Sequence, residues 1–89
     1  VHTLNLECNQ IGPAGAKALA TSKILTQVTS LSLVDNRVGD EGALAIAQSE
    51  NLKNLTYLHL GGNRVKTEEA KQALRESPYL TQLEKLKVF

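Results

Sequence analysis

Two adjacent glycines are the first residues in this chain that could do chemistry. The stretch LHLGGNRV, residues 58–65, runs from an apolar segment into Gly61 and Gly62, as a phosphate-binding loop does. Such a loop needs its helix to begin directly after the glycines, but here Asn63 and Val65 turn back towards the core first. A nucleotide site is therefore a weak interpretation of this stretch.

The other reactive side chains give little evidence for nucleophilic catalysis or for metal binding. Cys8 and His59 would serve as nucleophile and base, but the strands predicted to carry them are two strand steps, or about 10 Å, apart. His2 and His59 have no ligand spacing with other Cys or His residues. Glu7 and Asp35 could hold a cation weakly, although solvated surface carboxylates are the commoner interpretation. The sequence thus predicts no catalytic residue, no cofactor and no metal.

Composition places the chain among globular proteins without selecting a partner. Of its 89 residues, 42% are hydrophobic and 21% charged, and the net charge is +1, which argues against a disordered or strongly basic protein. Basic patches with interleaved aromatics are missing, so we expect no nucleic acid partner. Apolar runs fall short of the roughly 20 residues of a membrane span, so we expect no membrane partner.

Two further features concern location and origin. A single cysteine cannot form an internal disulfide and fits a reducing compartment, so the sequence favours the cytoplasm. Methionine is absent and the first residues already look like a strand, which predicts a fragment of a longer protein.

The chain repeats itself at a step of 27 residues, which is the signature of a repeat architecture. The matching columns are Leu4, Leu31 and Leu58; Leu6, Leu33 and Leu60; Asn9, Asn36 and Asn63; Ile11, Val38 and Val65; and Ala16, Ala43 and Ala70. In the third copy one residue is added before Ser77, so the step becomes 28. We expect one domain, residues 1–89, with repeats over 1–27, 28–54 and 55–82 and a partial fourth over 83–89.

Each copy changes periodicity partway through. Alternating leucines near its start predict a short strand with one buried face. Apolar residues then recur three and four positions apart, which predicts a helix of roughly 10 residues with one narrow apolar stripe. The helix starts carry local signals in Pro13, in Asp40 with Glu41, and in Thr67, and Pro78 should end the third helix.

The pattern LxxLxLxxNxI/V, as in LTYLHLGGNRV, resembles the leucine-rich repeats. The repeat length and helical second half are similar to the ribonuclease-inhibitor-like class, and GxxGAKALA and GDEGALAIA are similar to repeats of bacterial multi-repeat proteins and GALA-type effectors. The resemblance implies an α/β fold: a right-handed leucine-rich-repeat solenoid, a horseshoe segment with parallel strands on the concave face and helices on the convex face. It also implies intracellular protein binding.

Polar residues that recur in every copy are interpreted as scaffold. Asn9, Asn36 and Asn63 follow the strands, and we expect their side chains to satisfy loop backbone groups of neighbouring repeats. Four glycines are expected to permit a tight bend and close packing before the helices. They are Gly12, Gly15, Gly39 and Gly42.

The side chains that point away from the core along the strands form the candidate protein-binding surface. It changes from acidic to basic along the array, and the aromatic side chain in its middle is the expected anchor, beside a notch left by Gly61 and Gly62. The alternative is that this charged face only keeps the protein soluble. The candidate binding residues are Asn5, Glu7, Ser32, Asp35, Tyr57, His59, Lys85 and Lys87.

These observations predict a non-catalytic protein-interaction module that uses its concave face. Two alternatives stay open: a structural spacer within a longer repeat array, or the substrate-targeting arm of a ubiquitin-pathway or GTPase-regulating effector, which would act inside a host cell. The partner is expected to be another protein. Apolar side chains at both ends, with Val88 and Phe89 on an edge strand, also predict weak end-to-end self-association.

Overall fold

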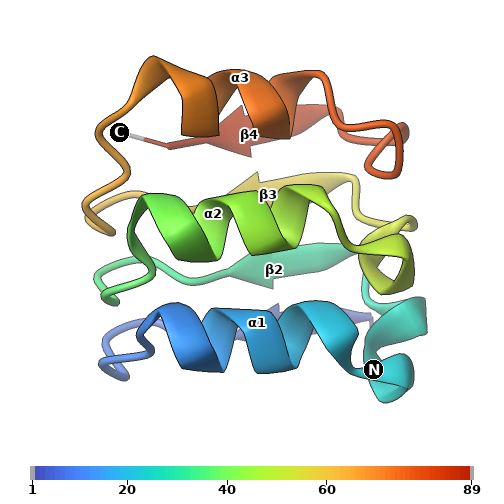
Figure 1. The fold of residues 1–89 in the computed structure, drawn as a ribbon. Coiled ribbons are helices and arrows are strands. Elements are labelled where there is room, and N and C mark those ends of the chain that lie inside the picture. Colours follow the sequence, from blue (N-terminus) through green and yellow to red (C-terminus); the bar gives the residue numbers. More distant parts are fainter. Residues whose placement is uncertain (1, 89) are drawn as a thin grey trace.

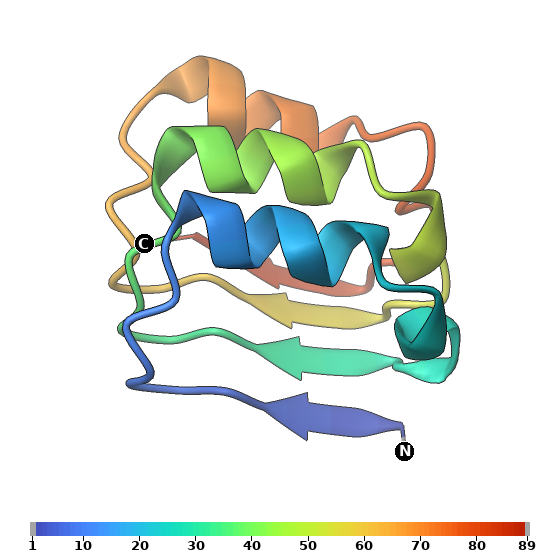
Figure 2. The same cartoon turned by 60° about the horizontal axis from the view of Figure 1, so that its bottom comes forward.

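The computed structural model describes residues 2–88, which form two layers (Figure 1). Three helices make one layer: α1 (Pro13–Thr21), α2 (Gly39–Ala47) and α3 (Glu68–Arg75). Four short strands make the other: β1 (Thr3–Asn5), β2 (Ser30–Ser32), β3 (Tyr57–His59) and β4 (Lys85–Lys87). Figure 2 shows the helices stacked over one face of the sheet, while the other face is left uncovered by any helix.

The sheet is parallel, with strand order β1-β2-β3-β4. Each strand pairs with the next at the sequence step of the repeat, so Leu4, Leu31, Leu58 and Leu86 stand on one line across the sheet. The added residue in the third copy falls between β3 and β4 and shifts only the numbering. The predicted α/β arrangement with parallel strands is confirmed.

The core lies between the two layers. Leucines of the inner strand face, such as Leu31 and Leu58, are completely buried against helix residues such as Ile46 and Leu74. The apolar stripe predicted for each helix faces the sheet and is confirmed. Because every strand contributes only one or two core side chains, each repeat depends on its neighbours for burial.

The helices begin where the sequence indicates. Pro13 lies in the first turn of α1, and Asp40 and Glu41 lie in the first turn of α2. Thr67 is the N-cap of α3, and its hydroxyl accepts a hydrogen bond from the backbone N–H of Ala70 at 3.2 Å. None of the helices among residues 2–88 is long and apolar enough to cross a membrane.

The segments from helix to next strand contain short 3₁₀ helices that the sequence pattern did not predict. They are η1 (Lys23–Gln27) and η2 (Glu50–Leu52). The third repeat has turns and bends over residues 78–82 instead. Helices of five and three residues are too short to give an apolar period, which is why the pattern could not reveal them.

The side chains of Asn36 and Asn63 join successive repeats, as predicted, whereas the Asn9 side chain bonds within its own loop, to the Glu7 carbonyl. The Oδ1 of Asn36 accepts hydrogen bonds from the backbone N–H groups of Asn9 and Ile11, both at 2.9 Å, and its Nδ2 donates to the Leu6 carbonyl at 2.8 Å. Asn63 repeats this arrangement one step further, accepting from the Val38 N–H at 3.1 Å. These side chains replace the hydrogen bonds that the irregular loops cannot make for themselves.

A second set of contacts between repeats comes from serines. The hydroxyls of Ser49 and Ser77 donate to the carbonyls of Ala20 and Ala47, near the end of the preceding helix. These carbonyls are among the groups that a helix end leaves without a partner. The serines therefore connect each repeat to the helix end of the preceding repeat, and the asparagines connect it to the preceding loop.

Of the four glycines predicted to allow a bend or close packing, Gly42 shows the packing role most clearly. A Cβ at this position would lie 2.5 Å from Val38 Cγ1 and 3.0 Å from the Cβ of Ala16 on the neighbouring helix. Gly15 is similarly close to Ile11. At Gly12 the prediction is wrong, because a Cβ there would meet nothing closer than 3.9 Å and its φ is −93°.

Candidate functional site

The sheet face that points away from the helices presents two rows of side chains. Parallel pairing places one residue of every strand in each row, and these residues alternate with the buried leucines. The rows are Thr3, Ser30, Tyr57 and Lys85, and Asn5, Ser32, His59 and Lys87. We call these eight residues, with Glu7 and Asp35 in the loops after β1 and β2, the outer strand face.

All eight predicted binding residues belong to this face, but the structure does not bring all of them together. Ser32, His59 and Lys87 are side-by-side neighbours in one row, and Tyr57 lies beside Lys85 in the other. Asn5 and Lys87 lie on opposite edges of the sheet, three strand steps or about 14 Å apart. A single small ligand could therefore touch only part of the predicted set.

Tyr57 and His59 form a preorganised pair at the centre of the face. Their ring centroids are 6.2 Å apart and the ring planes meet at 79°, an edge-to-face contact. The His59 Nδ1 accepts a hydrogen bond from the Gly61 N–H at 3.1 Å, which leaves the proton of a neutral ring on Nε2. Both side chains are half-buried, so Tyr57 is less exposed than expected and loses less freedom on binding.

The acidic end of the face is made by Glu7 and Asp35, both exposed. The Glu7 carboxylate accepts a hydrogen bond from the Ser32 hydroxyl at 2.8 Å, so it is held against β2. Asp35 has a φ of 57°, the same left-handed conformation as Cys8 and Gly62 at the equivalent positions of the other copies. Gly62 thus belongs to a turn that every copy makes, in a left-handed conformation that favours glycine.

The predicted notch beside the glycines is wrong. A Cβ added to Gly62 would overlap Asp35 Oδ1, so the carboxylate of the preceding repeat already occupies the space that the missing side chain leaves. The left-handed turn at Gly62 brings its backbone against that carboxylate. Side-chain packing between neighbouring loops of this kind could not be read from Gly61 and Gly62 alone.

Lys85 and Lys87 give the basic end, and both are exposed. Ion pairs within residues 2–88 join Lys17 to Glu41 at 2.5 Å and Arg75 to Glu68 at 4.0 Å, both on the helix layer. The two strand lysines belong to neither pair, so their charge stays available to a partner. The same residue range holds no group of three or more His, Cys, Asp or Glu side chains suited to a metal ion.

Two carboxyl groups on the helix layer have pKa values below their ordinary values. The pKa of the Asp40 carboxyl is held below its ordinary value by hydrogen bonds from the backbone N–H groups of Thr67 and Lys66, at 3.0 and 2.8 Å. The hydrogen bond and charge of Lys17 likewise lower the pKa of Glu41. Both carboxylates connect one repeat to the next, so these shifts report on the scaffold and not on catalysis.

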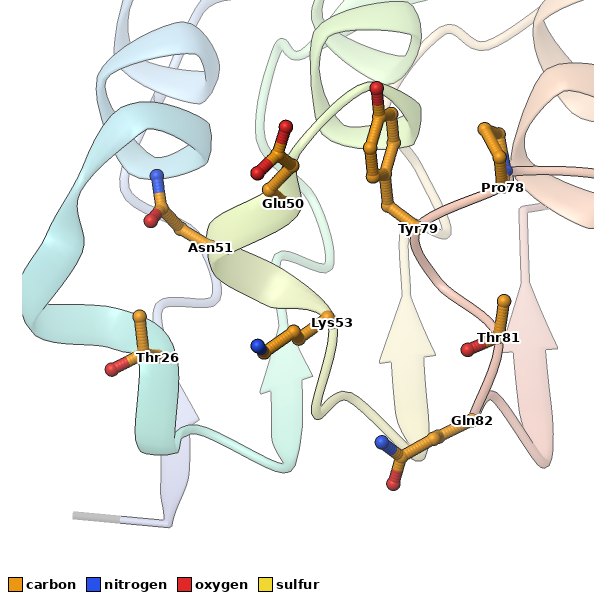
Figure 3. Close-up of a pocket in the computed structure, with 8 residues that line it drawn as sticks. All are labelled: Thr26, Glu50, Asn51, Lys53, Pro78, Tyr79, Thr81 and Gln82. Atoms are coloured by element: carbon orange, nitrogen blue, oxygen red, sulfur yellow. The ribbon is translucent and has the colours of Figure 1, made fainter.

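A groove of about 440 Å³ lies along the edge of the molecule where the strands begin (Figure 3). The Tyr79 ring stands between Glu50 and Pro78 in this view. The groove has both polar and apolar walls, and it opens where the third repeat lacks the 3₁₀ helix of the others. Its lining residues are Thr26, Glu50, Asn51, Lys53, Pro78, Tyr79, Thr81 and Gln82.

Sequence analysis did not identify this groove as a site. The only signal was the residue added before Ser77, which marks the copy whose connection to the next strand is irregular. The groove could accept a side chain of a partner. Its charged residues, Glu50 and Lys53, are both exposed.

Comparison with known proteins identifies the repeat. A family model described as "Leucine Rich repeat" matches residues 1–20, 25–47 and 51–68, which is more than half of the chain. No curated protein and no solved structure matches the chain.

Proposed function

Because the chain belongs to the leucine-rich-repeat family, we propose that it is a non-catalytic module that binds another protein with its outer strand face. Repeats of this family commonly mediate protein–protein interaction and are generally not catalytic. The observation that carries the proposal is the Tyr57–His59 pair, which is preorganised at the centre of the face. A rigid aromatic at the middle of a surface is the usual position of a binding hot spot.

The shape of the array supports the same surface. Neighbouring helices pack 8–10 Å apart whereas neighbouring strands are about 4.8 Å apart. We therefore propose that a stack of such units curves with the strands inside, so that the outer strand face is the concave side of the array. The right-handed, ribonuclease-inhibitor-like form of the solenoid belongs to the same proposal and comes from the family resemblance alone. A concave face surrounds a partner and buries more of it than a flat face would.

The opposite charges at the two ends of the outer strand face would orient a bound partner. Lys85 and Lys87 lie beside the aromatic pair on one side, and Glu7 and Asp35 lie towards the other. A partner segment with acidic residues over β4 and basic residues over the loops after β1 and β2 would meet opposite charge at both ends. Such complementarity mainly sets register and association rate.

The proposal is tested by capturing partners from a lysate of the source cells with the immobilised chain and identifying them by mass spectrometry. We expect the double variant Tyr57→Ala/His59→Ala to lose the captured protein. The matched control is Tyr79→Ala, which removes a half-buried tyrosine from the groove and leaves the outer strand face intact. Capture that is lost with Tyr79→Ala and kept by the double variant would move the binding site to the groove.

A structural spacer within a longer array is the second candidate. It is favoured by the small polar residues of β1 and β2, since Thr3, Asn5, Ser30 and Ser32 offer no large anchor over half of the face. In that case the double variant would retain all partners of the parent protein. We propose a cytoplasmic location for either role, or the cytoplasm of a host cell if the parent protein is an effector.

A further inference from the structure

We propose that the groove beside Tyr79 is a second protein-binding site, separate from the outer strand face. Its occupant is an extended segment of a partner protein in which an arginine stands two residues from an acidic residue. The groove, of about 440 Å³, crosses the connections of three successive repeats, from Thr26 to Gln82. It therefore lies along the side of the stack, between walls formed by residues 50–53 and 78–82 (Figure 3).

The side chains of this groove occupy positions that vary from one repeat to the next. Counted from the serine that each copy carries, Tyr79 corresponds to Ile24 and Asn51 in the first two copies. Glu50 corresponds to Lys23 in the first copy. An aromatic ring next to a carboxylate of the preceding repeat therefore occurs at a single step among the described repeats. Stacking of the repeats does not require this combination, so it needs another explanation.

Both walls are held in place before any partner binds. The Ser77 hydroxyl accepts hydrogen bonds from the backbone N–H groups of Tyr79 and Leu80, at 3.2 and 3.1 Å. The same hydroxyl donates to the Ala47 carbonyl of the preceding repeat. Leu80 and Leu52, one from each wall, are 4% and 0% exposed and anchor the walls in the core. A surface fixed in this way loses little conformational entropy when a partner binds.

The polar groups at the centre of the groove have no partner within residues 2–88. The Glu50 carboxylate, the Lys53 ammonium and the Tyr79 hydroxyl make no hydrogen bond or ion pair there. Glu50 and Lys53 stand three positions apart along the η2 turn, which rises about 2 Å per residue, so they are separated by roughly 6 Å along it. One wall of the groove thus offers one negative and one positive charge to a partner.

The negative end of this wall suits an arginine. The Tyr79 ring stands between Glu50 and Pro78 in Figure 3, and all three residues line the groove. A guanidinium group over the ring would direct its N–H groups to the carboxylate, while its methylene groups would contact the proline. A lysine would supply the charge but has no planar group to stack on the ring. The groove therefore favours arginine over lysine.

The positive end of the wall determines the second residue of the occupant. An arginine alone would approach Lys53 without compensation, whereas an acidic residue on the same segment pairs with this ammonium group. In an extended chain, alternate side chains lie on one side and are about 6.7 Å apart. This spacing is close to the separation of Glu50 and Lys53, so we place the acidic residue two positions from the arginine.

The test titrates the isotope-labelled 89-residue chain with short peptides and follows its backbone amides by NMR. The first probe is an acetylated, amidated pentapeptide with an arginine and a glutamate two positions apart among glycines. The second carries citrulline, which is neutral and has the same shape, in place of the arginine. We expect the first peptide to shift the amides of residues 26, 50–53 and 79–82. Glu50→Gln should raise its Kd roughly fourfold and leave the Kd of the citrulline peptide unchanged.

Three further variants assign the other contacts. Tyr79→Ala should raise the Kd of the arginine peptide about threefold, and Tyr79→Phe should leave it unchanged because the ring is retained. Lys53→Gln should raise the Kd about twofold through loss of the charge that meets the glutamate. Glu69→Gln is the matched control, since it neutralises an exposed carboxylate outside the groove, and it should change neither Kd nor the shifted amides.

Three outcomes would overturn the proposal. The first is the absence of amide shifts at the groove with millimolar arginine peptide, and the second is equal weakening of both peptides by Glu50→Gln. The third is a set of shifts centred on Tyr57 and His59, which would assign the peptide to the outer strand face. Partner capture by that face is measured with a different variant and without peptides, so either proposal can fail while the other stands.

Discussion

The first and second repeats have nearly the same pattern of residues and very different surroundings. In the second repeat Leu31, Leu33 and Val38 are completely buried, and Asn36 is 4% exposed. In the first repeat the equivalent leucines are only partly buried, and Asn9 is exposed. The sequence pattern is alike, so the difference comes from neighbours: the second repeat has one on each side and the first has one on a single side within the described chain.

This contrast shows that the side chains of a repeat are buried by its neighbouring repeats and not by the repeat itself. Leucines at equivalent positions of different repeats therefore contribute differently to the free energy of unfolding. The contribution depends on how many neighbouring repeats cover the side chain. Four substitutions or pairs of substitutions test this view, beginning with the one expected to have the largest effect.

Truncating matched strand leucines should separate the two repeats most clearly. We expect Leu31→Ala to reduce the free energy of unfolding by about 3 kcal/mol and Leu4→Ala by about 1 kcal/mol, because only the first leaves an enclosed cavity. Urea titration followed by circular dichroism measures both. Equal losses would mean that the first repeat is as well covered as the second and would break the comparison.

The matched asparagines should give a smaller difference. Asn36→Ala leaves part-buried backbone groups of Asn9, Ile11 and Leu6 without partners, so we expect a loss of about 2 kcal/mol. Asn9→Ala removes one exposed hydrogen bond to its own loop, and we expect a loss of at most about 0.5 kcal/mol. Chemical denaturation of the two variants under identical conditions decides this, and a costly Asn9→Ala would count against it.

Two glycines with left-handed backbone extend the comparison to the third repeat. Gly39 and Gly62 have φ values of 69° and 70°, but a Cβ meets nothing within 4 Å at Gly39 and overlaps Asp35 at Gly62. We expect Gly39→Ala to cost about 1 kcal/mol from backbone strain alone and Gly62→Ala roughly twice as much. Adding Asp35→Ala to Gly62→Ala should recover part of the difference in thermal unfolding; no recovery would exclude the contact with the carboxylate as its cause.

The smallest expected effect is on how the stability of the fold changes at acidic pH. Asp40 has a pKa below its ordinary value of 3.8 when folded, because backbone N–H groups of the third repeat bind its ionised form. Its stabilising contribution is therefore present above the unfolded pKa and is lost as the pH falls through the lower, folded pKa. We expect the thermal midpoint to fall less steeply below pH 4 in Asp40→Asn than in the unaltered chain. Identical slopes would show that this connection between the second and third repeats does not contribute.

Apart from the two short 3₁₀ helices, the sequence predicted the features that repeat and missed those that depend on a departure from repetition. The strand leucines, the helix stripes and the asparagine contacts could be foreseen because three copies present the same residue in the same place. The groove beside Tyr79 forms where the third copy has an added residue and no 3₁₀ helix, and the missing notch at Gly62 depends on one neighbouring carboxylate. A contact between two variable positions leaves no period in a sequence.

The sequence predicted on which face of the sheet the candidate binding residues lie, but not which contacts their side chains make. Alternation assigned Tyr57, His59 and Lys85 to the outer strand face, because successive strand residues point to opposite sides. It could not show that the two rings contact each other, or that Glu7 is held by Ser32. These contacts depend on side-chain rotamers across strands, which a single sequence does not determine.

The unshifted pairing of the four strands has a consequence for how such a protein can evolve. Each outer position has fixed coordinates on a regular grid, at one strand step in one direction and two residues in the other, and none of these side chains belongs to the core cluster. Mutation can therefore exchange one grid point at a time while the fold stays the same. In the proposed function, recognition and stability therefore rest on separate sets of residues, so a new specificity could be selected, or engineered, without rebuilding the scaffold.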